Sequence, residues 1–172
     1  ETSKFIEANK DTAFLAYLAF YAVHAPIQTT QKNWEYYRDK AERMGIADEG
    51  FEMERCLPIR KHQDNPVYAG LIEHMDEALG SVLQTLQEQG LDKNTVVIFT
   101  SDNGGVASGD NYSTSLDPLR GGKGYQWEGG IKVPYLIYVP WMHHNGEKNA
   151  TPAIGTDFYP TILDLAGIPL KP

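Results

Sequence analysis

One long amphipathic segment constrains the fold of this chain more than any other feature. Asn65 and Pro66 are residue types that favour the start of a helix, and apolar residues then recur at steps of three and four. This spacing predicts a helix over 66–89, ended by Gly90. After a short turn, the β-branched run 95–100 predicts a buried strand. A helix, a turn and a strand in this order are one unit of an α/β sheet.

The rest of the chain adds elements of the same fold class. The continuous apolar run 14–20 predicts a strand buried on both faces, as in a parallel sheet. We therefore expect an α/β fold with a mainly parallel sheet and flanking helices. The other predicted elements are helices at 3–9 and 34–43, a loop at 48–62, a long glycine-rich loop at 103–130, a strand at 133–139, and a last helix that begins at Thr156–Asp157, carries Pro160 in its first turn and ends at Gly167.

Composition excludes several kinds of partner and site. The net charge of −8, without a basic stripe, argues against binding to nucleic acid. The longest apolar run, 14–23, is about half of the roughly 20 residues that a membrane-spanning helix needs, so no membrane span is expected. Cys56 is the single cysteine of the chain, which rules out an internal disulfide and a cysteine metal cluster.

Two polar clusters follow directly on predicted strands. His24 comes after the first apolar run, and Asp102 and Asn103 come after the strand at 95–100. Ligands of open α/β sheets bind outside the carboxyl ends of the strands, so both clusters would meet at one edge if the strands are parallel neighbours. Asp102 and Asn103 offer hard oxygen ligands for Ca²⁺ or Mg²⁺, but the same residues also suit a turn. His24 alone fits either a catalytic or a hydrogen-bonded structural role.

The glycine-rich loop contributes a cation. Lys123 stands between Gly122 and Gly124, where it could reach an anionic group with help from backbone N–H groups. Composition alone favours a mobile, solvated loop over an anion-binding one.

Taken together, these segments resemble the arylsulfatase-type sulfatases, over nearly the whole chain and in the order of that family. The resemblance implies a part of the alkaline-phosphatase-like sandwich. The segments that carry it are His24-Ala25-Pro26, Tyr68-Ala69 with Met75-Asp76, the run from Val96 to Gly105, Gly122-Lys123-Gly124, Glu128-Gly129-Gly130, and Asp157-Phe158-Tyr159-Pro160-Thr161 continuing to Gly167.

The resemblance also implies a chemistry for four residues. Asp102 and Asn103 match the second pair of metal ligands for Ca²⁺ or Mg²⁺, an ion that polarises the sulfate. Lys123 matches a lysine that binds a sulfate oxygen, and His24 matches a histidine that contacts the sulfate and protonates the leaving oxygen. An amide at position 103, where related phosphatases usually have histidine, favours a hard ion and therefore a sulfatase.

We expect residues 1–172 to form part of a sulfatase catalytic domain, with the formylglycine nucleophile upstream and the isolated chain inactive. The resemblance implies a sulfated small molecule or glycan as substrate and a periplasmic or secreted location. Two alternatives stay open: a phosphoester or phosphonate hydrolase of the same superfamily, and a non-catalytic binding module on a decayed sulfatase fold.

Cys56 begins a pattern that imitates the formylglycine motif. The run Cys56-Leu57-Pro58-Ile59-Arg60 fits Cys-x-Pro-x-Arg, but it follows His24 instead of preceding it and no paired aspartates stand before it. We expect Cys56 to be a bystander.

Overall fold

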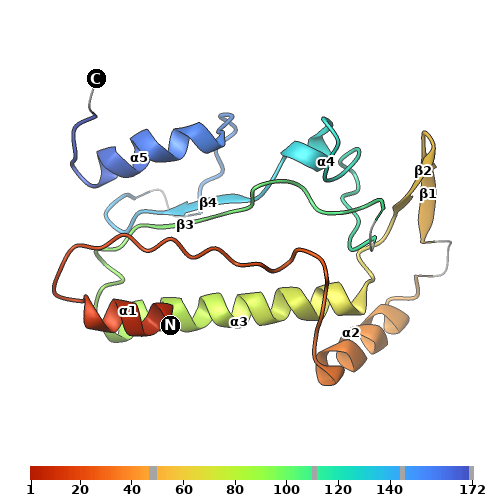
Figure 1. Ribbon diagram of the computed structural model, residues 1–172, viewed down its shortest axis with the longest axis horizontal. Coiled ribbons are helices and arrows are strands. Elements are labelled where there is room, and N and C mark those ends of the chain that lie inside the picture. Colours follow the sequence, from red (N-terminus) through yellow and green to blue (C-terminus); the bar gives the residue numbers. More distant parts are fainter. Residues whose placement is uncertain (47–49, 110–111, 144–145, 171–172) are drawn as a thin grey trace. The chain divides into compact units, whose positions relative to one another are not determined.

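The computed structural model describes residues 1–46, 50–109, 112–143 and 146–170. Contacts divide the chain into two compact units, Glu1–Trp141 and Met142–Pro172. In the first unit lie the helices α1 (Thr2–Ala8), α2 (Gln31–Arg43), α3 (Pro66–Glu88) and α4 (Glu128–Ile131), and the strands β1 (Phe51–Glu54), β2 (Leu57–Arg60), β3 (Val97–Thr100) and β4 (Tyr135–Tyr138) (Figure 1).

Helix α3 confirms the prediction from its caps and its apolar spacing. The Asn65 side chain accepts hydrogen bonds from the backbone N–H groups of Val67 and Tyr68, at 3.0 and 3.3 Å. These bonds satisfy two of the backbone donors that a helix start leaves free. Gly90 takes a φ of +69°, which closes the helix where glycine was expected to end it.

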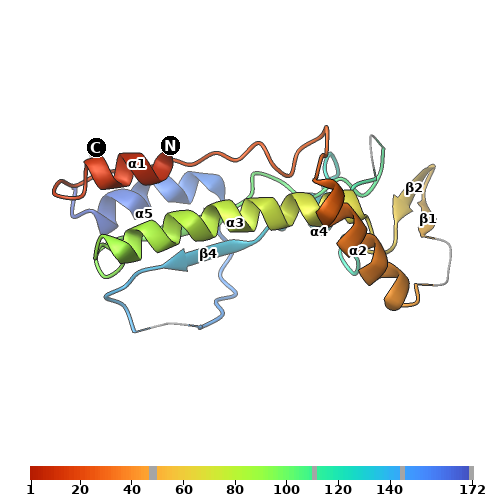
Figure 2. The same cartoon turned by 90° about the horizontal axis from the view of Figure 1, so that it is seen from below.

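Two shorter helices pack on α3 (Figure 2). Thr30 caps the start of helix α2, and the Asn33 side chain of this helix donates to the Glu73 carboxylate at 2.8 Å. A Cβ atom on Gly70 would lie 2.3 Å from the hydroxyl oxygen of Thr29, so glycine permits this close approach. Helix α1 contributes Ile6, which is 2% exposed.

Strands β3 and β4 form an antiparallel pair, with Val97 opposite Tyr138 and Thr100 opposite Tyr135. Both strands and the α/β class were predicted correctly, but the prediction of a mainly parallel sheet is wrong for the described residues. Parallel strands need a crossover, usually a helix, that carries the chain back to the starting end. Here the loop after β3 reverses at the end of that strand without crossing back, so β4 runs antiparallel to β3.

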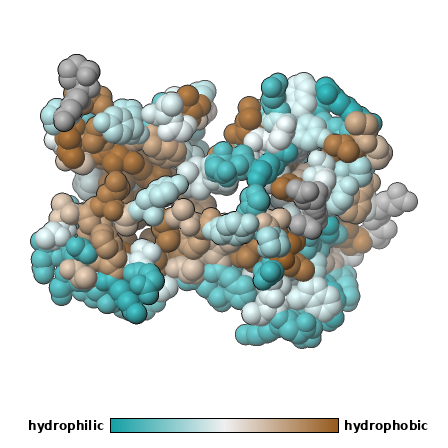
Figure 3. All heavy atoms as spheres, viewed as in Figure 1, coloured by the Kyte–Doolittle hydropathy of each residue, from teal (hydrophilic) through white to brown (hydrophobic). Residues whose placement is uncertain are grey.

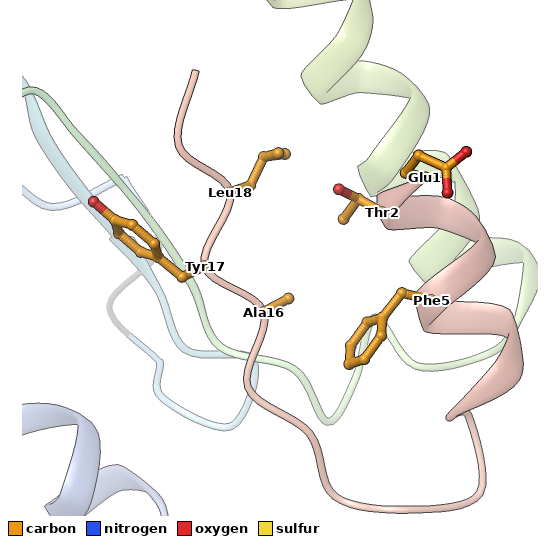
Figure 4. A pocket seen from close by; sticks show the side chains of 6 residues that line it. All are labelled: Glu1, Thr2, Phe5, Ala16, Tyr17 and Leu18. Carbon is orange, nitrogen blue, oxygen red and sulfur yellow. The ribbon is translucent and has the colours of Figure 1, made fainter. Parts of the chain in front are cut away.

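The predicted buried strand at 14–20 is also wrong. This segment is extended but unpaired, and Leu15 and Tyr17 are 73% and 92% exposed. Figure 4 shows Ala16 and Leu18 pointing toward α1 across an open pocket, whereas Tyr17 points away. An extended segment becomes a strand only when it is hydrogen-bonded to another strand, and the described strands pair as β1 with β2 and β3 with β4, without residues 14–20. Apolar residues consequently reach the surface, as Figure 3 shows for one face.

A loop was predicted over 48–62, of which residues 48–49 lie outside the described residues. Residues 51–60 instead form a β-hairpin of β1 and β2, closed at Arg55 and Cys56. Arg55 has a φ of +57°, as a tight reversal of the chain requires. Each strand has four residues, which is too short for an alternation that a sequence would reveal.

The second unit contains the short 3₁₀ helix η1 (Gly155–Asp157) and the helix α5 (Phe158–Leu165). The Asp157 side chain accepts a hydrogen bond from the Ile154 N–H at 2.8 Å, and Gly167 has a φ of +68°. The predicted last helix and its glycine end are thus confirmed. Within the described ranges, no helix combines the length and the apolar character needed to cross a bilayer.

Candidate functional site

Asp102 and Asn103 lie at the carboxyl end of β3. The Asn103 amide donates to the Asp102 carboxylate at 2.5 Å, and the Ser101 hydroxyl donates to the Asn103 carbonyl at 3.0 Å. Asp102 is exposed and Asn103 is half-buried. The bond between Asn103 and Asp102 holds the two side chains beside each other, with the amide nitrogen of Asn103 facing the Asp102 carboxylate.

This pair suits part of a cation site. Ca²⁺ takes roughly six to eight oxygen ligands and Mg²⁺ takes about six, so two residues supply a minority of either shell. Among the described residues, no cluster of three or more His, Cys, Asp or Glu side chains could hold a metal ion. Asp102 and Asn103 would therefore act together with ligands from elsewhere.

Backbone hydrogen bonds bring the Lys123 loop against the same segment. The Gly104 N–H donates to the Gly130 carbonyl at 2.9 Å, and the Lys123 N–H donates to the Gly105 carbonyl at 2.8 Å. The backbone of Lys123 is thus bonded to a residue two positions after Asn103. The Lys123 side chain itself is exposed.

Glycines make this approach possible. A Cβ atom on Gly104 would lie 1.8 Å from the Gly129 carbonyl oxygen, and one on Gly122 would lie 2.8 Å from the Gly105 carbonyl oxygen. Any other residue would push the two segments apart. Gly104, Gly122 and Gly129 are buried, so these glycines pack the loop onto its neighbour instead of leaving it solvated.

Glu54 of β1 holds the start of the same loop. Its carboxylate accepts a hydrogen bond from the Arg120 guanidinium at 2.7 Å and another from the Gly121 N–H at 3.2 Å. The Arg120 guanidinium also lies 4.2 Å from the centre of the Trp127 ring, a cation–π contact. The loop that carries Lys123 is therefore held by an ion pair between Arg120 and Glu54 of β1, and by the contact of Arg120 with Trp127 within the loop.

Helix α3 supports the site from its first turn. A Cβ atom on Gly105 would come within 3.8 Å of the Tyr68 hydroxyl, which places this ring beside the turn after Asn103. Burial raises the pKa of Tyr68, because the phenolate would lose solvation there.

His24 has contacts of its own. Its Nδ1 lies 2.8 Å from the Ala25 carbonyl oxygen, and its ring centre lies 5.5 Å from that of Tyr21. Because a carbonyl only accepts, Nδ1 carries the hydrogen, which leaves Nε2 to exchange a proton. The structure joins the segments of Asp102 and Lys123, whereas the recorded contacts of His24 stay within residues 21–25.

Glu54 was missed from the sequence, and so was its contact with Arg120. The two residues are 66 positions apart, and Glu54 lies in a hairpin whose strands are too short to be predicted from the sequence. The glycines around Arg120 and Lys123 were the signal that this loop packs closely.

Comparison with known proteins gives consistent similarities. The family model described as Sulfatase matches residues 1–168. Arylsulfatase J of Mus musculus is 32% identical over 152 residues, and a sulfatase of Formosa agariphila is 34% identical over 169 residues. These matches cover 87% and 93% of this chain but 21% and 27% of the two relatives. The chain therefore spans about a quarter of the length of the curated relatives it matches.

A solved structure is similar over almost the whole chain. The crystal structure of Ps i-CgsB in complex with k-i-k-neocarrahexaose has a TM-score of 0.77 and 28% sequence identity. The match covers 99% of this chain and 33% of that one.

Proposed function

This chain belongs to the sulfatase family, and on that basis we propose that the whole protein hydrolyses a sulfate ester at a site that includes Asp102, Asn103, Lys123 and His24. The observation that carries the proposal is the hydrogen bond from the Lys123 N–H to the Gly105 carbonyl, at 2.8 Å. It brings the backbone of Lys123 against the turn that follows Asp102 and Asn103, which supports a role for the three residues in one site. A cation and a metal-binding pair at one point are suited to an anionic, tetrahedral group.

Lys123 and His24 would each oppose negative charge on a different oxygen of the sulfate ester. The Lys123 ammonium would bind a sulfate oxygen and oppose its negative charge. As the ester bond breaks, negative charge moves to the leaving oxygen, and His24 would donate a proton from Nε2 to that oxygen. The hydrogen on Nδ1, held at 2.8 Å by the Ala25 carbonyl, keeps the ring in an orientation with Nε2 available.

Asp102 and Asn103 would hold Ca²⁺ or Mg²⁺ together with ligands from outside the described residues. When bound, such an ion supplies Lewis-acid polarisation of the sulfate oxygens. We also propose that the nucleophile is a formylglycine, made from a cysteine or serine outside residues 1–172.

A sulfated glycan is the substrate class we propose. Ps i-CgsB is similar to this chain over 99% of its length and was solved with a neocarrahexaose. Polymeric glycans meet enzymes outside the cytoplasm, and we therefore propose a periplasmic or secreted location.

Paired substrates test this function. The full-length protein should hydrolyse 4-nitrophenyl sulfate and release sulfate from a sulfated oligosaccharide, with much lower kcat/KM on 4-nitrophenyl phosphate. A preference for the phosphate ester would replace the proposal by phosphoester hydrolysis. Binding of the sulfated oligosaccharide without turnover of any ester would indicate a non-catalytic binding module.

A further inference from the structure

The β1–β2 hairpin makes contacts that the proposed reaction does not explain. We infer that Glu54 is a positioning residue for Lys123. It anchors residues 120–130, here called the glycine loop, so that the Lys123 ammonium meets the substrate at the end of β3. This inference rests on the proposed function for the role of Lys123. The anchoring itself is a property of the fold and is testable apart from activity.

Glu54 uses both carboxylate oxygens on two consecutive residues of the loop. Oε1 accepts from the Arg120 Nε at 2.7 Å, and Oε2 accepts from the Gly121 N–H at 3.2 Å. The Glu54 side chain is 12% exposed, whereas Arg120 is 52% exposed. Charge-assisted hydrogen bonds are stronger than neutral ones and are less screened where solvent is sparse. The contact is thus more than a solvated ion pair.

The other strand of the hairpin is bonded to the segment that follows Asn103. The Arg60 N–H donates to the Ala107 carbonyl at 2.9 Å, and Ile59 forms a β-bridge with Ser108. The hairpin therefore contacts the glycine loop through β1 and residues 107–108 through β2. The hydrogen bond from Lys123 to Gly105 joins these two segments directly, and the hairpin braces both of them.

Anchoring at Arg120 fixes both ends of the short stretch that carries Lys123. The Arg120 carbonyl accepts from the Gly129 N–H at 2.8 Å, and its guanidinium stacks on Trp127. Lys123 lies between these contacts. Within the described residues, its own hydrogen bond is the one from its backbone N–H to the Gly105 carbonyl. The position of Lys123 therefore rests on its bond to Gly105 and on Arg120, whose guanidinium Glu54 holds from outside the loop.

A flexible ammonium is useful only when its backbone is held. A misplacement of about 1 Å at a reacting group costs on the order of 100-fold in rate. In the full-length protein, Glu54→Ala should therefore lower kcat/KM for a sulfate ester by about 10- to 100-fold. Glu54→Gln should lower it less, because an amide oxygen still accepts one hydrogen bond. Glu52→Ala is the matched control: Glu52 is exposed on the same strand, and its loss should leave kcat/KM within about twofold.

A double-mutant cycle separates positioning from general damage. If Glu54 acts through Lys123, Glu54→Ala should cost little in a protein that already carries Lys123→Ala. An equal loss in both backgrounds would mean that Glu54 stabilises the fold without positioning Lys123, and it would overturn the inference.

Hydrogen exchange tests the anchor without any substrate. The amides of residues 121–130 should exchange faster in Glu54→Ala, or in Glu54→Gln if the alanine variant does not fold, than in Glu52→Ala. Unchanged exchange in this loop would overturn the anchor, whatever the kinetics show. If the wild-type protein cleaves no sulfate ester, the proposed function fails, whereas faster exchange in the Glu54 variant would still support the anchor.

Discussion

At the scale of single residues, the end of β3 depends on how two side chains share their polar atoms. The Asn103 amide nitrogen donates to one Asp102 carboxylate oxygen, so the Asn103 amide oxygen takes no part in this bond. The sequence revealed both residues and their oxygen chemistry, because a strand followed by Asp-Asn-Gly-Gly is a local pattern. It could not reveal the contact with the Lys123 loop, which depends on buried glycines some 20 positions later.

We expect Asp102→Ala to weaken binding of Ca²⁺ or Mg²⁺ strongly, because it removes the charged member of the pair and leaves the Asn103 amide alone. Calorimetric titration of the full-length protein with each ion measures this. Asp11→Ala, at an exposed carboxylate after α1, is the control and should bind as the wild type does. Equal affinities in all three proteins would show that the metal is bound elsewhere.

We expect Lys123→Ala and His24→Ala each to lower kcat/KM for a sulfate ester by about 100-fold or more, the scale for losing one charge-stabilising or proton-donating group. Lys93→Ala and His74→Ala change the same residue types at the turn before β3 and on α3, and should have little effect. Steady-state kinetics on the four variants decides the matter. Near-normal rates for Lys123→Ala and His24→Ala would return both residues to structural roles.

Tyr68 predicts how stability depends on alkaline pH. Its folded-state pKa is raised by burial above the ordinary value of 10.0, so the unfolded chain loses this proton first as the pH rises. The unfolded state then binds fewer protons, and the free energy of unfolding falls from about pH 10 upward. Chemical denaturation between pH 8 and 11 should show this fall, with a smaller slope in Tyr68→Phe. An equal slope in both proteins would assign the effect to other groups.

At the scale of elements, the sequence predicts those helices and strands that are determined by residues within their own segment. Helix α3 and strand β3 are specified by caps, spacing and β-branched residues within their own segments, and both were predicted. Whether residues 14–20 become a strand depends on a neighbouring strand, and the hairpin of β1 and β2 depends on pairing between two four-residue runs. Long-range pairing has no local signature, so these segments were assigned wrongly.

Two glycines on α3 predict opposite effects of the same substitution. Gly80→Ala should stabilise the protein by about 0.5–1 kcal/mol, because the site is exposed and alanine restricts the unfolded chain. Gly70→Ala should destabilise it by about 1–3 kcal/mol through overpacking, because the new methyl group would meet Thr29 and Asn33 of the α2 region. Thermal denaturation of the two variants and the wild type measures both shifts. A rise in melting temperature for Gly70→Ala would mean that α2 and α3 do not pack as described.

At the scale of the whole molecule, the order of weak motifs was more informative than any one of them. No single pattern distinguishes a metal pair from a turn, or an anion-binding lysine from a solvated loop. Their succession from His24 to Gly167 matches one family, and the family model covers residues 1–168. The chain nevertheless spans 21% to 27% of the two curated relatives described.

Cys56 tests this view of the whole protein. The thiol is exposed at the turn of the β1–β2 hairpin, and Arg60, which completes the Cys-x-Pro-x-Arg pattern, is bonded to Asp64 at 2.7 Å. That arginine braces the fold, as its further bonds to the His62 carbonyl at 3.2 Å and the Tyr112 carbonyl at 3.1 Å also indicate. Cys56→Ala in the full-length protein should therefore leave kcat/KM for a sulfate ester largely unchanged.

Mass spectrometry of the active protein completes that test, because a formylglycine residue and an unmodified cysteine differ in mass. We expect a peptide with an unmodified thiol at Cys56 and an aldehyde at a cysteine or serine outside residues 1–172. The isolated chain of residues 1–172 should cleave no sulfate ester, since two metal ligands without a nucleophile do not assemble the reaction. An aldehyde at Cys56, together with loss of activity in Cys56→Ala, would place the nucleophile on the hairpin and contradict the roles given to the other four site residues.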